Sequence, residues 1–499
     1  MRLKKIFWRV TMDNLVRGWE IVIGLEVHAQ VLTKSKLFSS SPTNFGADPN
    51  SQVSFYDAAM PGMLPVLNEQ AIDQAIKSGF GIKGTINRIS RFDRKNYFYP
   101  DLPSGYQISQ FYHPIVSNGK IEIDLKDGSK KLINIERIHL EQDAGKSIHD
   151  LSPEFSYIDL NRSGVPLMEI VSKPDMRSSY EAIQYVKKLR MILRYIGASD
   201  CNMEQGNLRV DANISIRKPG DKFGNRVEIK NINSLKFLGQ ALEYEIERQI
   251  IAIESGEKII QETRLFDSNC GETRSMRSKE DAADYRYFPD PDLKPVILSQ
   301  ERIEQIKNNM PELPDEKKQR FIKEYSIPES DAIVLIEDKT TANYFEKAVK
   351  SSKFESIKSA KLIANWIIVE LFAILNKDGK TIDEIDFPIE YIAELVDLII
   401  DKTISGKIAK IVFSKMADTC EHPTKIVKDL GLVQIQDESV IKKVVEEIIA
   451  KHPDQVAQYK AGKDQLFGFF VGQSMKALQG KGNPEIVNKI LMDILNQSL

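Results

Sequence analysis

Near the beginning of the chain, residues 21–28 read Ile21-Val22-Ile23-Gly24-Leu25-Glu26-Val27-His28. This apolar run is typical of a β-strand, whose side chains point alternately to its two faces. Glu26 and His28 therefore share one face, while Leu25 and Val27 share the other. Ionisable side chains on one side of an otherwise apolar strand predict a sheet with one buried face and one polar face.

Side chains of the same kind occupy one face of later apolar segments. They are His139, Glu141 and Asp143 in residues 138–143, Glu169 in 167–171, and Arg209, Asp211 and Asn213 in 208–214, with Glu204 just before this last segment. Plain amphipathicity is one explanation, because antiparallel sheets often have a solvated face. This face, however, concentrates negative charge, which repels itself unless a cation is bound. Several carboxylates and a histidine suit Mg²⁺, which in turn suits nucleotide phosphates.

Length and composition limit the class of protein. A chain of 499 residues predicts two to four domains. The 69 Lys+Arg and 71 Asp+Glu residues give a net charge of −2, which excludes binding to nucleic acid through net charge but leaves open a segregated basic face. Three widely spaced cysteines exclude a disulfide framework. The most apolar stretch, 362–375, is too short for a membrane span, and we expect a cytoplasmic protein.

The organisation along the chain predicts an α+β fold. Residues 19–295 alternate strand-like and helical patterns, and the sequence after about 300 is helical. The expected strands lie around 19–28, 132–143, 157–171, 207–217 and 226–234, and the two long helices run from a cap at Ser179 to Gly197 and from about 235 to 255. The last arginine is Arg320. Because arginine grips phosphate and carboxylate well, this favours chemistry upstream of 320, although biased codon usage explains the pattern equally well.

Two phosphate-binding motifs fail because of their context. Residues 79–84 spell GxGxxG, but they follow a helical run where the dinucleotide-binding motif requires a strand. Residues 145–147 resemble the end of a P-loop, but Leu140 stands where the first glycine is required. If the protein uses ATP, we expect another architecture to bind it. Segments 91–101, 103–107 and 284–291 interleave cations with aromatic rings, which suits phosphate and base contacts but also plain packing.

These segments closely resemble the B subunit of the aspartyl/glutamyl-tRNA amidotransferases. The matching stretches are 20–28 (EIVIGLEVH), 92–110 (FDRKNYFYPDLPSGYQISQ), 141–147 (EQDAGKS), 159–171 (DLNRSGVPLMEIV), 203–215 (MEQGNLRVDANIS), 228–234 (EIKNINS), 261–264 (QETR), 284–290 (DYRYFPD), 472–476 and 482–488. The resemblance implies an antiparallel-sheet catalytic cradle domain at 19–295, similar to glutamine synthetase. An all-α helical domain at 296–404 and a tRNA-contacting tail domain at 405–499 follow it. Residues 1–18 are an N-terminal extension outside the resemblance.

The resemblance also implies a reaction, an ATP-dependent ligation. Glu attached to tRNA(Gln), or Asp attached to tRNA(Asn), is phosphorylated on its side-chain carboxylate by ATP with Mg²⁺, and ammonia then displaces the phosphate. An amidase, the A subunit, frees ammonia from glutamine, and a small C subunit joins the two, which makes a heterotrimer. A non-catalytic tRNA-binding scaffold is the alternative. The sequence leaves open the choice of tRNA, the ammonia path and the direct metal ligands.

Matching the family position by position gives the candidate site residues. Glu26, His28, Glu141 and Glu169 are the catalytic and metal-binding candidates. The candidates for contact with ATP or substrate are Lys95, Tyr97, Glu204, Arg209, Asp211, Asn213 and Arg286.

The sequence departs from part of the family in segment 39–57. Many members carry four cysteines there, spaced as a zinc site, whereas the matching positions here are Ser39, Ser41, Ser54 and Asp57. These side chains cannot make a thiolate site, so no zinc is expected. We expect packing of Phe38, Phe55 and Tyr56 to order this loop instead.

Overall fold

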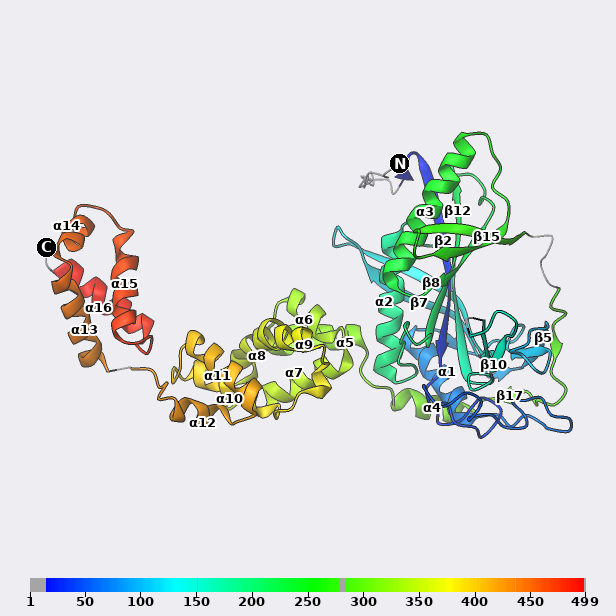
Figure 1. The fold of residues 1–499 in the computed structure, drawn as a ribbon, viewed down its shortest axis with the longest axis horizontal. Coiled ribbons are helices and arrows are strands. Elements are labelled where there is room, and N and C mark those ends of the chain that lie inside the picture. The colour runs from blue at the N-terminus through cyan, green and yellow to red at the C-terminus, as the bar shows by residue number, and fades with distance from the viewer. Residues whose placement is uncertain (1–14, 150, 279–283, 436, 498–499) are drawn as a thin grey trace. The chain divides into compact units, whose positions relative to one another are not determined.

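The computed structural model describes residues 15–149, 151–278, 284–435 and 437–497. The chain forms two compact units, residues 1–314 and residues 315–499, which are described separately (Figure 1). The predicted N-terminal extension lies outside the described residues except for 15–18, where the short strand β1 pairs with the start of β2. No helix among the described residues is both long enough and apolar enough to cross a membrane.

A single large sheet dominates the first unit, with thirteen strands in the described part of the chain. Its strands are β1 (Leu15–Val16), β2 (Trp19–Gln30), β3 (Thr85–Ile86), β5 (Asp93–Asn96), β6 (Tyr106–Ser109), β7 (Val116–Asp124), β8 (Lys130–Gln142), β11 (Pro166–Ser172), β12 (Leu208–Arg217), β13 (Val227–Ile232), β14 (Glu262–Asp267), β15 (Glu272–Ser278) and β16 (Phe288–Pro289). The main order is β15-β14-β13-β12-β2-β11-β8-β6-β5-β16, with β7 paired to β8. Two separate small ladders join β9 (Lys146–Ile148) to β10 (Tyr157–Asp159) and β4 (Ile89–Ser90) to β17 (Val296–Ile297).

The sheet is mixed, which corrects the expectation of an antiparallel one. Strands β13 and β14 run parallel. Helix α3 (Leu235–Glu254) connects them, and parallel neighbours require such a crossover because a tight turn would reverse the chain. The expected strands at 207–217 and 226–234 are present as β12 and β13, which pair as antiparallel neighbours. The expected strand at 157–171 is divided into β10 and β11 by residues 160–165.

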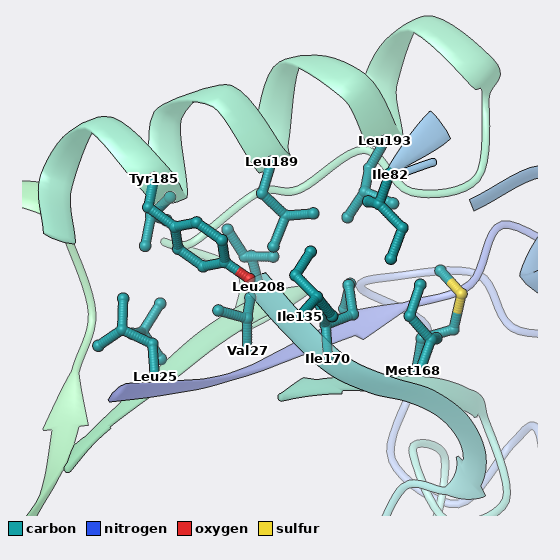
Figure 2. Packing of buried hydrophobic residues seen from close by; sticks show 14 of the residues in the cluster. Leu25, Val27, Ile82, Ile135, Met168, Ile170, Tyr185, Leu189, Leu193 and Leu208 are labelled. Atoms are coloured by element: carbon teal, nitrogen blue, oxygen red, sulfur yellow. The ribbon is translucent and has the colours of Figure 1, made fainter. Parts of the chain in front are cut away.

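Helix α2 (Ser179–Ile196) covers one face of the sheet. Its Tyr185, Leu189 and Leu193 point at the strands and belong to the same hydrophobic cluster as Leu25 and Val27 of β2 (Figure 2). All five side chains are buried. The cap of this helix is Ser178 rather than Ser179: its Oγ accepts a hydrogen bond from the N–H of Glu181, which satisfies a free donor of the first turn. Gly197 ends the helix with φ +70°, as expected.

Two further helices of the first unit pack against each other. Helix α1 (Glu69–Gly81) ends within the GxGxxG stretch, which is thus a helix terminus. The predicted domain limit at 295 stays a prediction. Helix α4 (Gln300–Asn308) belongs to this unit, which extends to residue 314. The physical reason is contact with α1: Arg302 Nη2 lies 2.6 Å from Asp73 Oδ1, and Ile303 and Ile306 are buried in the core of the sheet.

The second unit is helical. Its elements are α5 (Pro314–Tyr325), α6 (Glu329–Ile336), α7 (Lys339–Ser351), α8 (Ser356–Asn365), a π-helical segment (Trp366–Leu371), α9 (Phe372–Asp378), a 3₁₀ turn (Ile382–Glu384), α10 (Glu390–Ile400), α11 (Gly406–Thr419), α12 (Pro423–Asp429), α13 (Glu438–Lys451), α14 (Pro453–Lys460), α15 (Leu466–Ala477) and α16 (Pro484–Gln497). Helices α13, α15 and α16 share a hydrophobic cluster that includes Ile441, Phe470 and Leu491. The predicted division of this part at 404 stays a prediction.

The loop between β2 and α1 is ordered differently from the expectation. Phe38 is buried, with its ring centroid 6.4 Å from that of Tyr56 and 5.2 Å from that of Phe92. Phe55, by contrast, is 70% exposed, so the prediction that it packs here is wrong. Polar contacts around Asp57 supply the missing order, and they are described below.

We predict that Glu245 stabilises the α3 edge of the first unit. Its fully buried carboxylate accepts hydrogen bonds from Arg248 (2.6 Å), Gln249 (2.9 Å) and Thr273 of β15 (2.9 Å). In the Glu245→Ala variant, Arg248 loses its buried partner, which is expected to cost about 3–5 kcal/mol. Hydrogen exchange of α3 amides measures this loss. The control Gln240→Ala, at an exposed position of the same helix, is expected to change stability by about 0.5 kcal/mol at most; equal protection in both variants would contradict the assignment.

Candidate metal and catalytic site

Three neighbouring strands bring ionisable side chains into one row across the sheet. Glu169 of β11 lies directly opposite His28 of β2 on one side and His139 of β8 on the other. Directly opposite residues of antiparallel strands point to the same face. Because Val27 and Ile170 of these strands point into the core under α2, the row lies on the other face of the sheet, hereafter the polar face.

The side chains of this row are close together and little exposed. Glu169 Oε2 lies 3.4 Å from the Nε2 atoms of both His28 and His139. Glu141, two residues beyond His139 on β8, places its carboxylate 3.7 Å from His28 Nε2 and 3.6 Å from His139 Nε2. The most exposed of the four side chains, that of His28, is only 17% exposed. Two carboxylates and two imidazoles therefore lie in contact with one another, largely shielded from solvent.

Electrostatics couples these four groups. Burial disfavours a charged His139, but the carboxylates of Glu169 and Glu141 outweigh it and raise the pKa of His139 to about 9. The pKa of His28 is raised in the same way, against the effect of burial. For Glu169, burial acts to raise the pKa, yet His139 and His28 hold it well below its usual value. The two imidazoles thus balance the negative charge of the carboxylates.

Three of these residues form a set suited to a divalent cation. One ligand atom each from His28, Glu141 and Glu169 lies within 4.8 Å of the others, the one such group among the described residues. Two carboxylate oxygens and one imidazole nitrogen leave room for water and phosphate oxygens, which Mg²⁺ commonly retains as ligands. A bound cation would take over the charge balance and favour neutral imidazole. The donor set therefore fits the predicted metal.

Glu26 lies outside this set, although it occupies the same face of β2. Its Oε1 accepts a hydrogen bond of 2.9 Å from Asn213 Nδ2. Burial, with the charges of Glu169 and Glu228, raises the pKa of Glu26. Its role as a fourth ligand stays a prediction.

Strand β12 brings three more predicted residues to the polar face. Arg209 lies opposite His28, and Asp211 lies opposite Glu26. Arg209 Nη2 donates to Asp143 Oδ1 at 2.8 Å, and Asp211 Oδ2 accepts from Lys230 of β13 at 2.6 Å. Asp211 and Arg209 are therefore held in ion pairs, while Asn213 is bonded to Glu26.

Lys95 and Tyr97 lie in an aromatic group beside the row. Lys95 Nζ is 4.9 Å from the ring centroid of Tyr285, and the ring centroids of Tyr97 and Tyr285 are 5.9 Å apart. The Tyr97 hydroxyl donates to Gln107 at 3.2 Å. Burial, followed by the charge of Glu141, raises the pKa of Tyr97, which indicates that this ring is close to the row.

Two predicted residues are not among the side chains gathered in the row. Arg286 is 82% exposed and faces Asp284, with 3.5 Å between Nε and Oδ2. Glu204 is exposed in the turn before β12. Their predicted contacts with substrate stay predictions.

Some residues of the polar face were not chosen from the sequence. The sequence pattern puts His139 on the same face as Glu141, but His139 is not among the candidate site residues; the strand register puts it opposite Glu169. Glu228 and Lys230 alternate in the same way on β13, and Lys230 lies 3.0 Å from Glu228. Because Glu228 and Lys230 are two residues apart on one strand, the sequence alone was enough to predict that they share a face. Tyr287 lies in the aromatic and cationic segment 284–291, and its ring stacks on that of Phe111 with 4.1 Å between the centroids, a contact between distant segments that the sequence pattern does not specify.

Comparison with known proteins supports the interpretation of this face. The chain matches the model of the GatB/GatE catalytic domain over residues 21–304 and that of the GatB domain over residues 343–495. It is 56% identical over 485 residues to the B subunit of the aspartyl/glutamyl-tRNA(Asn/Gln) amidotransferase of Granulibacter bethesdensis, covering 97% of this chain and 99% of that relative. The B subunits of the same name from Rickettsia conorii (56% identical; 96% and 98% covered) and Zymomonas mobilis (54%; 97% and 99%) are similar.

The protein is thus an α+β protein whose mixed sheet carries a carboxylate- and histidine-lined face within a domain of the GatB/GatE catalytic type. The chain belongs to the family of aspartyl/glutamyl-tRNA(Asn/Gln) amidotransferase B subunits, which confirms the resemblance found in its sequence.

We predict that the row binds a divalent cation. Mn²⁺ titrated into the protein and followed by electron paramagnetic resonance serves as the probe. Replacing a direct ligand, as in Glu169→Gln or Glu141→Gln, is expected to weaken binding at least as much as the roughly 10–100-fold effect of outer partners. Glu204→Gln is the matched control and is expected to bind as the wild type does. Unchanged Mn²⁺ affinity in both ligand variants would exclude the assigned set.

Proposed function

We propose that this chain is the B subunit of a tRNA-dependent amidotransferase and carries the step that forms the amide. In this reaction an oxygen of the side-chain carboxylate of Glu-tRNA(Gln) or Asp-tRNA(Asn) attacks the γ-phosphorus of ATP, and ADP leaves. Ammonia then attacks the carbonyl carbon, and phosphate leaves with the former carboxylate oxygen. A carboxylate is a poor acyl donor, and the phosphate makes it a good one.

The observation that carries this proposal is the row of His28, Glu169 and His139 with Glu141 beside it. It lies within the residues that match a catalytic domain, and its donor set suits Mg²⁺. An ion held by His28, Glu141 and Glu169 would neutralise charge that develops on the phosphate oxygens.

The chain's other residues have roles that follow from their contacts. His139 touches both carboxylates from the buried side and orients them. Lys95 and Arg209 lie on opposite flanks of the row, and we assign them to contact with the anionic substrates. Arg209 is fixed for this by Asp143, and Lys95 by the aromatic rings around it.

The names of the relatives support the assembly and the setting that we propose. The name of a B subunit implies partner subunits, and in our proposal the amidase (the A subunit) supplies ammonia while the small C subunit joins the complex. The cytoplasm is the setting that suits a role in protein synthesis. The likeness of its catalytic domain to glutamine synthetase remains part of the proposal, as does the tRNA-contacting role of the tail domain.

The alternative is a non-catalytic scaffold that only binds tRNA. A scaffold has no use for two carboxylates and two histidines buried together, because an ionic cluster of this kind is costly to bury. The presence of the complete row therefore favours the enzyme.

We predict that Glu141→Ala abolishes amide formation without affecting the amidase. The chain is purified with its A and C subunits and supplied with ATP, Mg²⁺, ammonium and Glu-tRNA(Gln) or Asp-tRNA(Asn). Amide formation is expected to fall by roughly two orders of magnitude or more, because charge stabilisation is lost. Glutamine hydrolysis by the amidase should persist in the variant, and Glu257→Ala, at an exposed position outside the candidate site, should retain both activities. Amide formation at the wild-type rate in Glu141→Ala would refute the site; tRNA binding without any amide from the wild type would favour the scaffold.

A further inference from the structure

The loop that follows β2 is organised around a buried ion pair outside the polar face. Lys36 Nζ lies 3.2 Å from Asp57 Oδ2, and the two side chains are 0% and 1% exposed. Two hydroxyls also donate hydrogen bonds to this carboxylate: Ser39 Oγ donates to Oδ1 at 3.0 Å, and Ser54 Oγ donates to Oδ2 at 2.9 Å. The backbone N–H of Ser54 also donates to Oδ2 at 2.9 Å. Asp57 is thus the hub of the loop.

The same ion pair also contacts a second loop, residues 160–165. Lys36 Nζ donates to the carbonyl of Leu160 at 3.2 Å, and the N–H of Leu37 donates to the carbonyl of Gly164 at 2.9 Å. Gly164 has φ +81°, and a side chain there would place its Cβ 3.0 Å from Asp57 Oδ1. The carboxylate therefore rests against bare backbone. Because glycine alone suits both this approach and this φ, the two loops fit one defined arrangement.

The second loop leads directly to the polar face. The N–H of Gly164 donates to the carbonyl of Asp143, and the N–H of Asp143 donates to the carbonyl of Val165, both at 2.9 Å. The side chain of Asp143 holds Arg209, which lies opposite His28. A cavity of about 220 Å³ is lined by Asp57, Gly164 and Asp143 among others, so the carboxylate partner of the ion pair and the residue that holds Arg209 border the same space.

Stability alone is a weak reason for this arrangement. Two charges lose their hydration when they are buried, and replacing such a pair by apolar side chains of similar size is often neutral or stabilising. The contribution of the pair is therefore to fix the position of the loop that carries Gly164. We propose that Lys36 and Asp57 are positioning residues of the amide-forming site, which hold Asp143, and through it Arg209, in place beside the metal-binding row. This inference rests on the proposed function.

The test removes the pair while preserving volume. The double variant Lys36→Met/Asp57→Leu is prepared in the complex with the A and C subunits. We expect the complex to assemble with a lowered unfolding temperature, because Ser39 and Ser54 lose their buried acceptor. At temperatures where the complex is folded, we expect kcat for amide formation to fall by roughly tenfold to 100-fold, the scale of a 1 Å misplacement. The glutaminase activity of the amidase should not change. Lys34→Met, at an exposed lysine of the same loop, is the matched control and should keep the wild-type kcat.

A second variant covers the case in which the double variant does not assemble. Ser39→Ala/Ser54→Ala removes both hydroxyl donors from Asp57 but leaves the ion pair, and we expect a smaller loss of kcat at unchanged stability. A wild-type kcat in either assembled variant would overturn the proposal. Glu141→Ala is measured beside them: if it is inactive while the loop variants are not, only the positioning role fails, whereas an active Glu141→Ala complex refutes the proposed function itself.

Discussion

The burial of one face of the sheet beneath α2 determines what its other face can display. Leu25, Val27 and Ile170 are buried with the apolar side chains of α2, and a shift of any of these strands by one residue would expose them. The same constraint holds Glu169 between His28 and His139, since alternate residues of each strand must point away from the core. Hydrophobic burial thus sets the register, and the polar row follows from it.

The row is also held by its own charges. Two buried carboxylates repel each other, and two imidazoles beside them relieve this repulsion without a metal. A cation bound by His28, Glu141 and Glu169 would take over this charge balance, with His28 neutral. The ion pairs of Arg209 and Asp211 at the edge of the row extend this balance, so that the polar face combines anionic and cationic groups in fixed positions. This combination suits a reaction between a carboxylate and a phosphate.

Local parity made part of this arrangement predictable from the sequence. Alternation within a single strand places Glu26 and His28 on one face, and this inference requires no knowledge of the neighbouring strands. Strand order is not local: β11 enters between β2 and β8 through pairings between distant segments, so the contact of Glu169 with His139 was not foreseen. The parallel pair β13 and β14 and the docking of α4 on α1 depend on tertiary contacts in the same way. The Lys36–Asp57 pair is not predictable from the sequence, because polar residues in a loop are usually exposed and nothing in their pattern indicates that these two are buried.

If the side-chain carboxylate is phosphorylated at the polar face, one of its oxygens must leave with the phosphate, and isotope transfer measures this. Glu-tRNA(Gln) or Asp-tRNA(Asn) labelled with ¹⁸O in the side-chain carboxylate is given to the complete complex with ATP, Mg²⁺ and ammonium, and the phosphate released is analysed by mass spectrometry. The account predicts one ¹⁸O in phosphate for each amide formed by the wild type, and neither product from Glu169→Gln. Unlabelled phosphate accompanying amide in the wild type, or labelled phosphate at the wild-type rate from Glu169→Gln, would contradict it.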